Sequence, residues 1–376
     1  CLSSLIAPYG LYKSAANHVY DAEMFSYAKF VPGYFFRYDE KGFKTNASGC
    51  GNDLATERYM VRRFVIDSLK FWASRYLMDG FRFDLMGLMD TTTIQGMAKE
   101  LKQIYPEIML YGEGWEMPTP LEPHKAANYK NYWQLTNLAF FNDLFRDGFK
   151  GSPLKLTKGY VLGEKIDKEL FIHLIKGSCQ DEFRFLAPTQ SINFVECHDN
   201  YTFFDQMKIL CKDFSPEEQL DRVRLALSLV VFSQGIPFIH AGEEFLRTKQ
   251  GVENSYRSDD KINGLDWDRQ QAFDELTQSL SDMIALRKEY ALFRMTEREQ
   301  AEKHIKFDKS GINQCVSFRL ISETEELQVI VCNSYEAEVF YFAPLVTLIF
   351  DGQRKVQKEV SQLEINRPSV YILRRR

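Results

Sequence analysis

Residues 79–84 read DGFRFD, a short apolar run that ends on the carboxylate of Asp84. Two further apolar runs also lead to carboxylates. Residues 108–113 (IMLYGE) end on Glu113, and residues 192–200 (INFVECHDN) contain Asp199. Polar residues at the carboxyl ends of buried parallel strands are where barrels of alternating strands and helices place their chemistry. These three segments therefore predict an α/β fold whose strand ends share one face.

The chain around these segments alternates between helical and strand patterns. Apolar residues recur with helical spacing at 61–76, 92–104, 216–233 and 271–290, whereas the predicted strands are short apolar runs. Those strands are at 80–84, 108–113, 138–142, 192–196 and 236–240. Strands separated by helices indicate parallel pairing through crossover connections. The predicted fold class is α/β, an incomplete TIM-type (β/α)8 barrel.

The pattern changes after about residue 291. Five short strands are expected from there on, separated by Gly, Asn and Pro. They are predicted at 304–307, 314–320, 327–333, 345–350 and 370–373. Because no further long helical pattern follows, residues 291–376 are predicted to form a small C-terminal all-β sandwich domain.

Composition and charge argue against nucleic-acid binding, membrane binding and a cysteine-based metal site. The net charge of −5 gives no electrostatic attraction to nucleic acid or to an anionic membrane, so neither is expected as a partner. Seven scattered cysteines show no CxxC pair and no metal spacing. We expect free thiols in a reducing compartment, which predicts a cytoplasmic location. No cofactor and no metal are assigned.

Arg82 and Asp84 share one face of their strand, because side chains alternate. A neighbouring guanidinium keeps a carboxylate ionised, as a nucleophile requires; the alternative is a buried ion pair without chemistry. Glu113 lies 29 residues beyond Asp84, one strand–helix–strand step, so the two strand ends are expected to be neighbours. Like charges held close raise one pKa, which suits Glu113 as the proton donor; such pairs lie ~5–5.5 Å apart in retaining glycosidases.

Asp199 directly follows His198. The two side chains could hold adjacent sugar hydroxyls, and the carboxylate would stabilise positive charge in an oxocarbenium-like transition state. A structural histidine is the alternative for His198. Together the three carboxylates predict acid-catalysed cleavage of a glycosidic bond.

The segments 80–84, 112–115 and 195–200 resemble short signatures of the α-amylase superfamily. More specific segments resemble type I pullulanases: 17–21 (NHVYD), 31–35 (VPGYF), 51–58 (GNDLATER), 141–148 (FNDLFRDG), 254–256 (NSY) and 266–267 (DW). The resemblance covers residues 17–290. It implies hydrolysis of α-1,6-glucosidic linkages in pullulan, starch or glycogen limit dextrins with retention of configuration.

The resemblance also implies a role for individual residues. Asp84 would be the nucleophile, Glu113 the acid/base and Asp199 the transition-state stabiliser. An α-glucan would be the substrate and binding partner. Residues implied to support the site or to contact sugar are Arg82, His18, His198, Trp115, Tyr201, Asn254 and Tyr256.

The chain departs from the family at its beginning. Only Asn17 and His18 remain of the family's first signature, Lys13 stands where the family has Asp, and residues 1–16 do not match. Sixteen residues are too few for the family's first two strands. We therefore expect a barrel at 17–290 that lacks its first strands, with exposed strand edges and low stability and activity. The alternatives are a truncated, inactive pullulanase fragment that at most binds glucan, and an isoamylase-type enzyme, which residues 254–256 and 112–115 disfavour.

Overall fold

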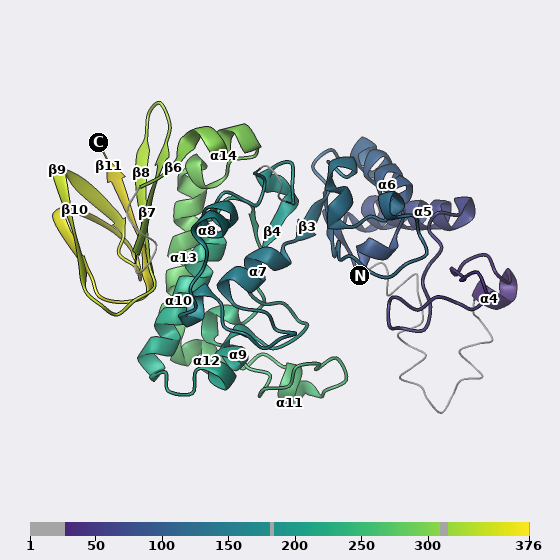
Figure 1. The fold of residues 1–376 in the computed structure, drawn as a ribbon, viewed down its shortest axis with the longest axis horizontal. Helices are drawn as coiled ribbons and strands as arrows, with labels where there is room; N and C mark the ends of the chain where they lie inside the picture. The colour runs from purple at the N-terminus through teal and green to yellow at the C-terminus, as the bar shows by residue number, and fades with distance from the viewer. Residues whose placement is uncertain (1–26, 181–183, 309–314, 376) are drawn as a thin grey trace. The chain divides into compact units, whose positions relative to one another are not determined.

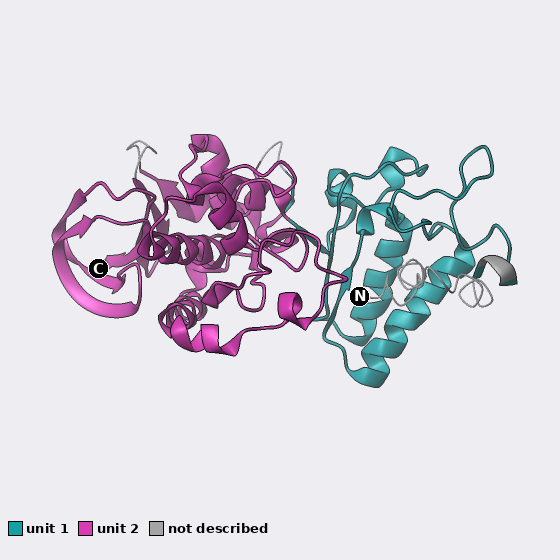
Figure 2. Cartoon of the chain, turned by 90° about the horizontal axis from the view of Figure 1, so that it is seen from below, with its two compact units in different colours: residues 1–141, 184–186 teal, residues 142–183, 187–376 magenta. Residues whose placement is uncertain are grey.

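The computed structural model describes residues 27–180, 184–308 and 315–375, and the chain divides into two compact units (Figure 2). Unit 1 comprises residues 27–141 with 184–186, and unit 2 comprises residues 142–180 and the described residues from 187 to 375. The predicted segment 1–16 and the predicted site residue His18 lie outside the described residues.

Unit 1 contains three short parallel strands and two long helices, with 3-10 turns between them. Its elements are α4 (Tyr27–Phe30), α5 (Tyr59–Tyr76), β1 (Gly80–Phe83), η1 (Met86–Leu88), α6 (Thr91–Ile104), β2 (Met109–Gly112), η2 (Pro123–Lys125), η3 (Tyr129–Gln134) and β3 (Ala139–Phe141). The predicted helices at 61–76 and 92–104 are present as α5 and α6. The side chain of Asp90 caps α6 by accepting from Thr93 N, and α6 ends before Pro106, which supports these boundaries.

The register of β1 and β2 brings two of the predicted carboxylates to neighbouring strand ends. Gly80 pairs with Met109 and Phe83 with Gly112 in a parallel ladder. Asp84 and Glu113 are therefore the first residues beyond two adjacent strands. β2 pairs in turn with β3, and among the described residues β2 is the one strand hydrogen-bonded to β1. Unit 1 closes no barrel in the part of the chain that the structure describes.

Unit 2 combines helices, two short parallel strands and an antiparallel sheet (Figure 1). Its helices are α7 (Asp143–Phe149), α8 (Lys168–Ile175), α9 (Phe203–Leu210), α10 (Pro216–Phe232), α11 (Asp260–Asn263), α12 (Trp267–Ala272), α13 (Asp274–Glu289) and α14 (Arg298–His304). Its 3-10 turns are η4 (Tyr160–Leu162), η5 (Pro188–Gln190), η6 (Glu243–Phe245) and η7 (Ala291–Phe293). Its parallel strands, β4 (Ser191–Asn193) and β5 (Ile236–Pro237), pair through Ile192 and Ile236. Among the described residues, no helix is both long and apolar enough to traverse a bilayer.

The C-terminal strands confirm the predicted all-β domain. They are β6 (Ile305–Phe307), β7 (Cys315–Ile321), β8 (Glu326–Cys332), β9 (Glu338–Phe350), β10 (Lys355–Ile365) and β11 (Ser369–Arg375). They form an antiparallel sheet in the order β10-β9-β11-β8-β7-β6. One apolar face joins a core with α10 and α13, and a second cluster lies around Ile330 and Tyr371. Figure 1 shows α10 and α13 beside the sheet. The sheet therefore has buried apolar clusters of its own as well as a shared core.

The prediction of free thiols is wrong for two cysteines. Cys315 and Cys332 lie directly opposite each other in the β7–β8 ladder and form a disulfide, with their Cα atoms 4.1 Å apart. The turn between the strands sets this register, which a sequence separation of 17 does not reveal. Cys179 and Cys211 are buried free thiols. A cytoplasmic location stays a prediction.

Candidate functional site

Arg82 lies between two of the predicted catalytic carboxylates. Its Nη1 donates to Asp84 Oδ1 at 2.7 Å, and its Nη2 donates to Glu113 Oε1 at 2.7 Å. The three side chains are 14% (Arg82), 34% (Asp84) and 10% (Glu113) exposed. One guanidinium therefore orients both carboxylates from adjacent nitrogens, an arrangement that a lysine's single ammonium does not reproduce.

Glu113 is fixed by its backbone as well as by its side chain. Its N–H donates to Phe83 O at 3.0 Å, and its carbonyl accepts from Gly87 N at 3.0 Å. Its second carboxylate oxygen accepts from Leu85 N at 2.8 Å. Leu85 has a φ of +46°, in the left-handed region that is costly for a branched side chain. The strained backbone after β1 therefore supplies one of the donors that fix the Glu113 carboxylate.

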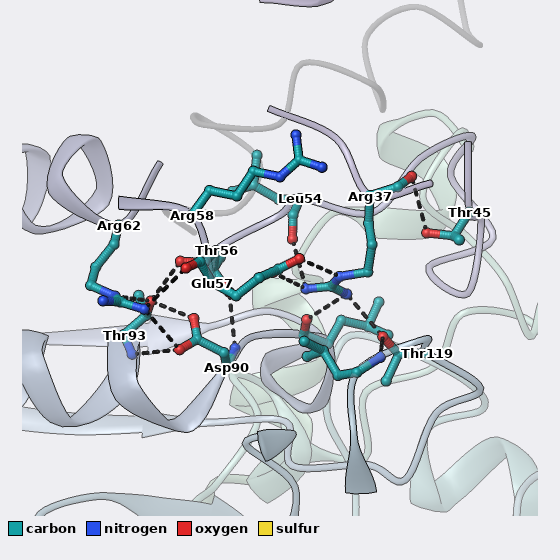
Figure 3. Close-up of polar contacts among 12 residues, drawn as sticks. Arg37, Thr45, Leu54, Thr56, Glu57, Arg58, Arg62, Asp90, Thr93 and Thr119 are labelled. Carbon is teal, nitrogen blue, oxygen red and sulfur yellow. Dashed lines mark hydrogen bonds and ion pairs between the residues drawn. The ribbon is translucent and has the colours of Figure 1, made fainter. Parts of the chain in front are cut away.

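A buried polar network supports the loops that follow β1 and β2 (Figure 3). Arg37 is 4% exposed and binds both carboxylate oxygens of Glu57, with Nη2 to Oε2 at 2.8 Å. Its Nη1 donates to Leu88 O at 3.1 Å, beyond β1, and to Thr119 Oγ1 at 2.9 Å, beyond β2. Arg37 thus links the segment before α5 to both loops. Arg37 was not predicted as a site residue, although an arginine inside the apolar run FFRY is the same signal that singled out Arg82.

The network continues to the start of α6. Asp90 N donates to Thr56 Oγ1 at 2.9 Å, and Thr93 Oγ1 donates to Thr56 O at 2.8 Å, as Figure 3 shows. Arg62 forms an ion pair with Asp90 at 3.4 Å. All of these groups lie in unit 1, so the loop between β1 and α6 is attached to the segment before α5.

Asp199 and His198 lie in unit 2, on the loop between β4 and α9. Their side chains are 53% (Asp199) and 61% (His198) exposed, and His198 Nε2 is 3.3 Å from Asp199 Oδ2. The structure thus brings together Arg82, Asp84 and Glu113 in one unit, and His198 with Asp199 in the other. Ligand atoms of Cys197, His198 and Asp199 lie within 4.8 Å of one another, a group that could hold a metal ion.

Charged side chains are buried beneath the 197–201 loop. Glu196 accepts from Phe203 N and lies 2.8 Å from His240 Nδ1. Burial lowers the pKa of Lys150 to about 8, against an opposing attraction from Glu196. Burial, together with the charge of Glu196, raises the pKa of Glu243 well above its ordinary value. These residues were not predicted as site residues, because their burial follows from the fold rather than from any spacing.

The other residues predicted to contact sugar, Trp115, Tyr201, Asn254 and Tyr256, lie on three different loops. Trp115 is half-buried in the loop after β2, and Tyr201 offers its carbonyl to Lys150 Nζ at 2.7 Å. Asn254 is exposed, and Tyr256 is 71% exposed with the Arg257 guanidinium 5.0 Å from its ring centroid. An exposed aromatic ring on a loop can stack against a sugar.

Comparisons with known proteins agree with these motifs. Residues 34–285 match the α-amylase catalytic domain family. The chain is 43% identical over 295 residues to a pullulanase of Bacillus subtilis strain 168, covering 77% of this chain but 41% of that protein. These matches confirm the predicted resemblance to pullulanases.

Solved structures give the same result. The chain is similar to the type I pullulanase of B. subtilis strain 168 complexed with maltose (TM-score 0.90, 37% identity, 95% of this chain and 52% of that one). It is also similar to a pullulanase of Anoxybacillus sp. LM18-11 complexed with maltotetraose (TM-score 0.88, 37% identity, covering 93% of this chain and 51% of that one). The chain thus spans about half the length of these relatives.

Proposed function

The chain belongs to the α-amylase catalytic domain family, and on this premise we propose that it hydrolyses α-1,6-glucosidic linkages in pullulan, starch or glycogen limit dextrins. The observation that carries the proposal is the joint binding of Asp84 and Glu113 by Arg82 at adjacent strand ends. The names of the similar proteins supply the substrate class, since those relatives are pullulanases solved with maltose and maltotetraose.

The proposed mechanism is a retaining double displacement. Asp84 attacks the anomeric carbon and forms a glycosyl ester, while Glu113 gives its proton to the departing glycosidic oxygen. Water then attacks the anomeric carbon; Glu113 takes its proton, and Asp84 leaves as a carboxylate. Arg82 orients the Asp84 carboxylate for the attack, and Leu85 N fixes the second oxygen of Glu113. Asp199 is proposed to stabilise the positive charge of the transition state, with His198 and His18 holding sugar hydroxyls.

Asp84→Asn tests this assignment. We expect pullulan hydrolysis to fall by at least roughly 10³-fold, because an amide cannot form the glycosyl ester. Asp79→Asn is the matched control, since Asp79 is exposed at the opposite end of the same strand and should leave the rate unchanged. Equal rates for Asp84→Asn and the unaltered protein would refute the proposal.

Substrate comparison tests the linkage. Product release from pullulan, glycogen and linear amylose should favour the first two, which carry α-1,6 linkages. Faster cleavage of amylose would contradict the debranching assignment. Glucan binding without product release would support the alternative of an inactive protein that only binds glucan.

A further inference from the structure

The loop that carries His198 and Asp199 is attached to two buried lysines. Lys150 and Lys249 are each 1% exposed. Lys150 Nζ donates to Tyr201 O at 2.7 Å, and Lys249 Nζ donates to His198 O at 3.1 Å. The exposed side chains of this loop are thus positioned by backbone carbonyls bonded to ammonium groups beneath them.

Lys249 also reaches a second loop. Its Nζ donates to Glu253 O at 3.0 Å, and the next residue along is Asn254, with Tyr256 two positions further. The same ammonium therefore joins the 197–201 loop to the 252–256 loop. Both loops carry residues that the proposed function assigns to the substrate site.

The backbone of Lys249 is itself held in place. Its N–H donates to Asp205 Oδ2 at 2.7 Å, and Thr248 Oγ1 donates to the other oxygen of the same carboxylate. Asp205 lies in the first turn of α9, immediately after the 197–201 loop. The lysine is consequently fixed at its backbone as well as at its ammonium group.

Burying an ammonium group is unfavourable unless its hydrogen bonds are satisfied. Burial lowers the pKa of Lys249, while the charges of Glu196 and Asp199 oppose that change. An apolar side chain could fill the same volume without this desolvation penalty. What a lysine adds here is a cation that bonds to two loops at once.

We propose that Lys249 is a positioning residue. It holds the His198–Asp199 loop and the Asn254–Tyr256 loop at a fixed distance from each other, so that both loops can contact the glucan. The inference rests on the proposed function in one respect, which is that these two loops form part of the substrate site. Lys249 acts through backbone carbonyls and contacts no reacting atom. Small displacements of a catalytic group can cost ~10²-fold in rate, so its loss should lower kcat more than stability alone explains.

The test compares Lys249→Met with Lys150→Met. Both substitutions remove a buried ammonium, but within the described part of the chain Lys150 Nζ donates to Tyr201 O of the 197–201 loop and not to residues 252–256. In Lys249→Met, amide hydrogen exchange should rise in both loops and kcat on pullulan should fall by ~10²-fold. In Lys150→Met, exchange should rise in 197–201 while 252–256 stays as in the unaltered protein.

Two further measurements keep the proposal falsifiable. Lys249→Gln, which retains a donor, replaces Lys249→Met if that variant does not fold. In the unaltered protein, the amides of both loops should open with the same free energy, because one side chain joins them. Independent opening of the loops, or unchanged exchange at 252–256 in the Lys249 variants, would overturn the proposal. Because exchange does not depend on activity, an unaltered protein without pullulan hydrolysis would refute the proposed function and leave this test intact.

Discussion

At the scale of single residues, the alternation of side chains along β1 predicts one of the two ion pairs of Arg82 and not the other. The alternation placed Arg82 and Asp84 on one face, and their ion pair is present at 2.7 Å. The second bond, to Glu113, depends on the register of β1 against β2, which aligns Arg82 with Tyr111. The alternation of side chains within one strand does not fix this register.

Removing Arg82 should lower the rate of the reaction. In Arg82→Leu, both carboxylates lose the donor that orients them, so kcat on pullulan should fall by ~10²-fold. Arg82→Lys is the control, because a single ammonium cannot reproduce both bonds and should restore only part of the rate. An unchanged kcat in Arg82→Leu would contradict the orienting role.

At the scale of elements, the loops after β1 and β2 touch through a glycine. A Cβ added to Gly87, in η1, would lie 1.9 Å from Trp115 O, in the loop after β2. The same glycine donates its N–H to Glu113 O. The turn that supports the proposed acid/base therefore requires a residue without a side chain.

Gly87→Ala should damage stability and activity together. The added methyl group would push the two loops apart, at a cost of about 1–3 kcal/mol in the free energy of unfolding, and kcat should fall as Glu113 moves. Gly96→Ala in α6 is the matched control, since its Cβ would meet Ile66 Cδ1 at an ordinary 3.4 Å. The control should gain up to about 1 kcal/mol from helix propensity. Urea titration and pullulan kinetics measure both effects, and a neutral Gly87→Ala would contradict the packing argument.

Long helices and apolar strands were predictable, whereas the short helices α8 and α9 and the polar strand β10 were not. The predicted strand at 80–84 and helix at 216–233 correspond to β1 and α10. β10 was missed because it is an edge strand with the polar sequence KVQKEVSQLEI and pairs with β9 alone among the described strands. The helix predicted at 271–290 is two helices, α12 and α13, which meet at Phe273.

At the scale of the whole molecule, the domain boundary predicted from the sequence and the boundary between the two compact units fall at different residues. The predicted domain boundary lies near residue 290, where helices give way to strands. The structure divides the chain after Phe141. In unit 2 one hydrophobic cluster contains Leu227 of α10, Met283 of α13 and Ile372 of β11, so the C-terminal sheet shares its core with the helices. Shared burial of this kind depends on tertiary packing, which the local pattern does not encode.

The acid stability of unit 2 should depend on His173, a buried residue of α8. Burial lowers the pKa of His173 from 6.5 to about 4. Between pH 6.5 and about 4 the folded protein therefore keeps the imidazole neutral, whereas the unfolded chain takes up a proton. Because the unfolded state binds more protons between these values, stability should be lost as pH falls from about 6.5 to about 4, by up to about 3 kcal/mol.

His173→Gln should remove this part of the acid sensitivity. The free energy of unfolding, measured in urea at pH 7, 5.5 and 4.5 with a probe in unit 2, should fall less steeply with acid than in the unaltered protein. The absolute stability at pH 7 can change, since the substitution alters a buried contact, so the slope is the quantity that decides. His124→Gln serves as the control, because His124 is exposed and its loss should leave the slope unchanged. Parallel pH dependences for His173→Gln and the unaltered protein would show that the buried imidazole does not govern acid unfolding.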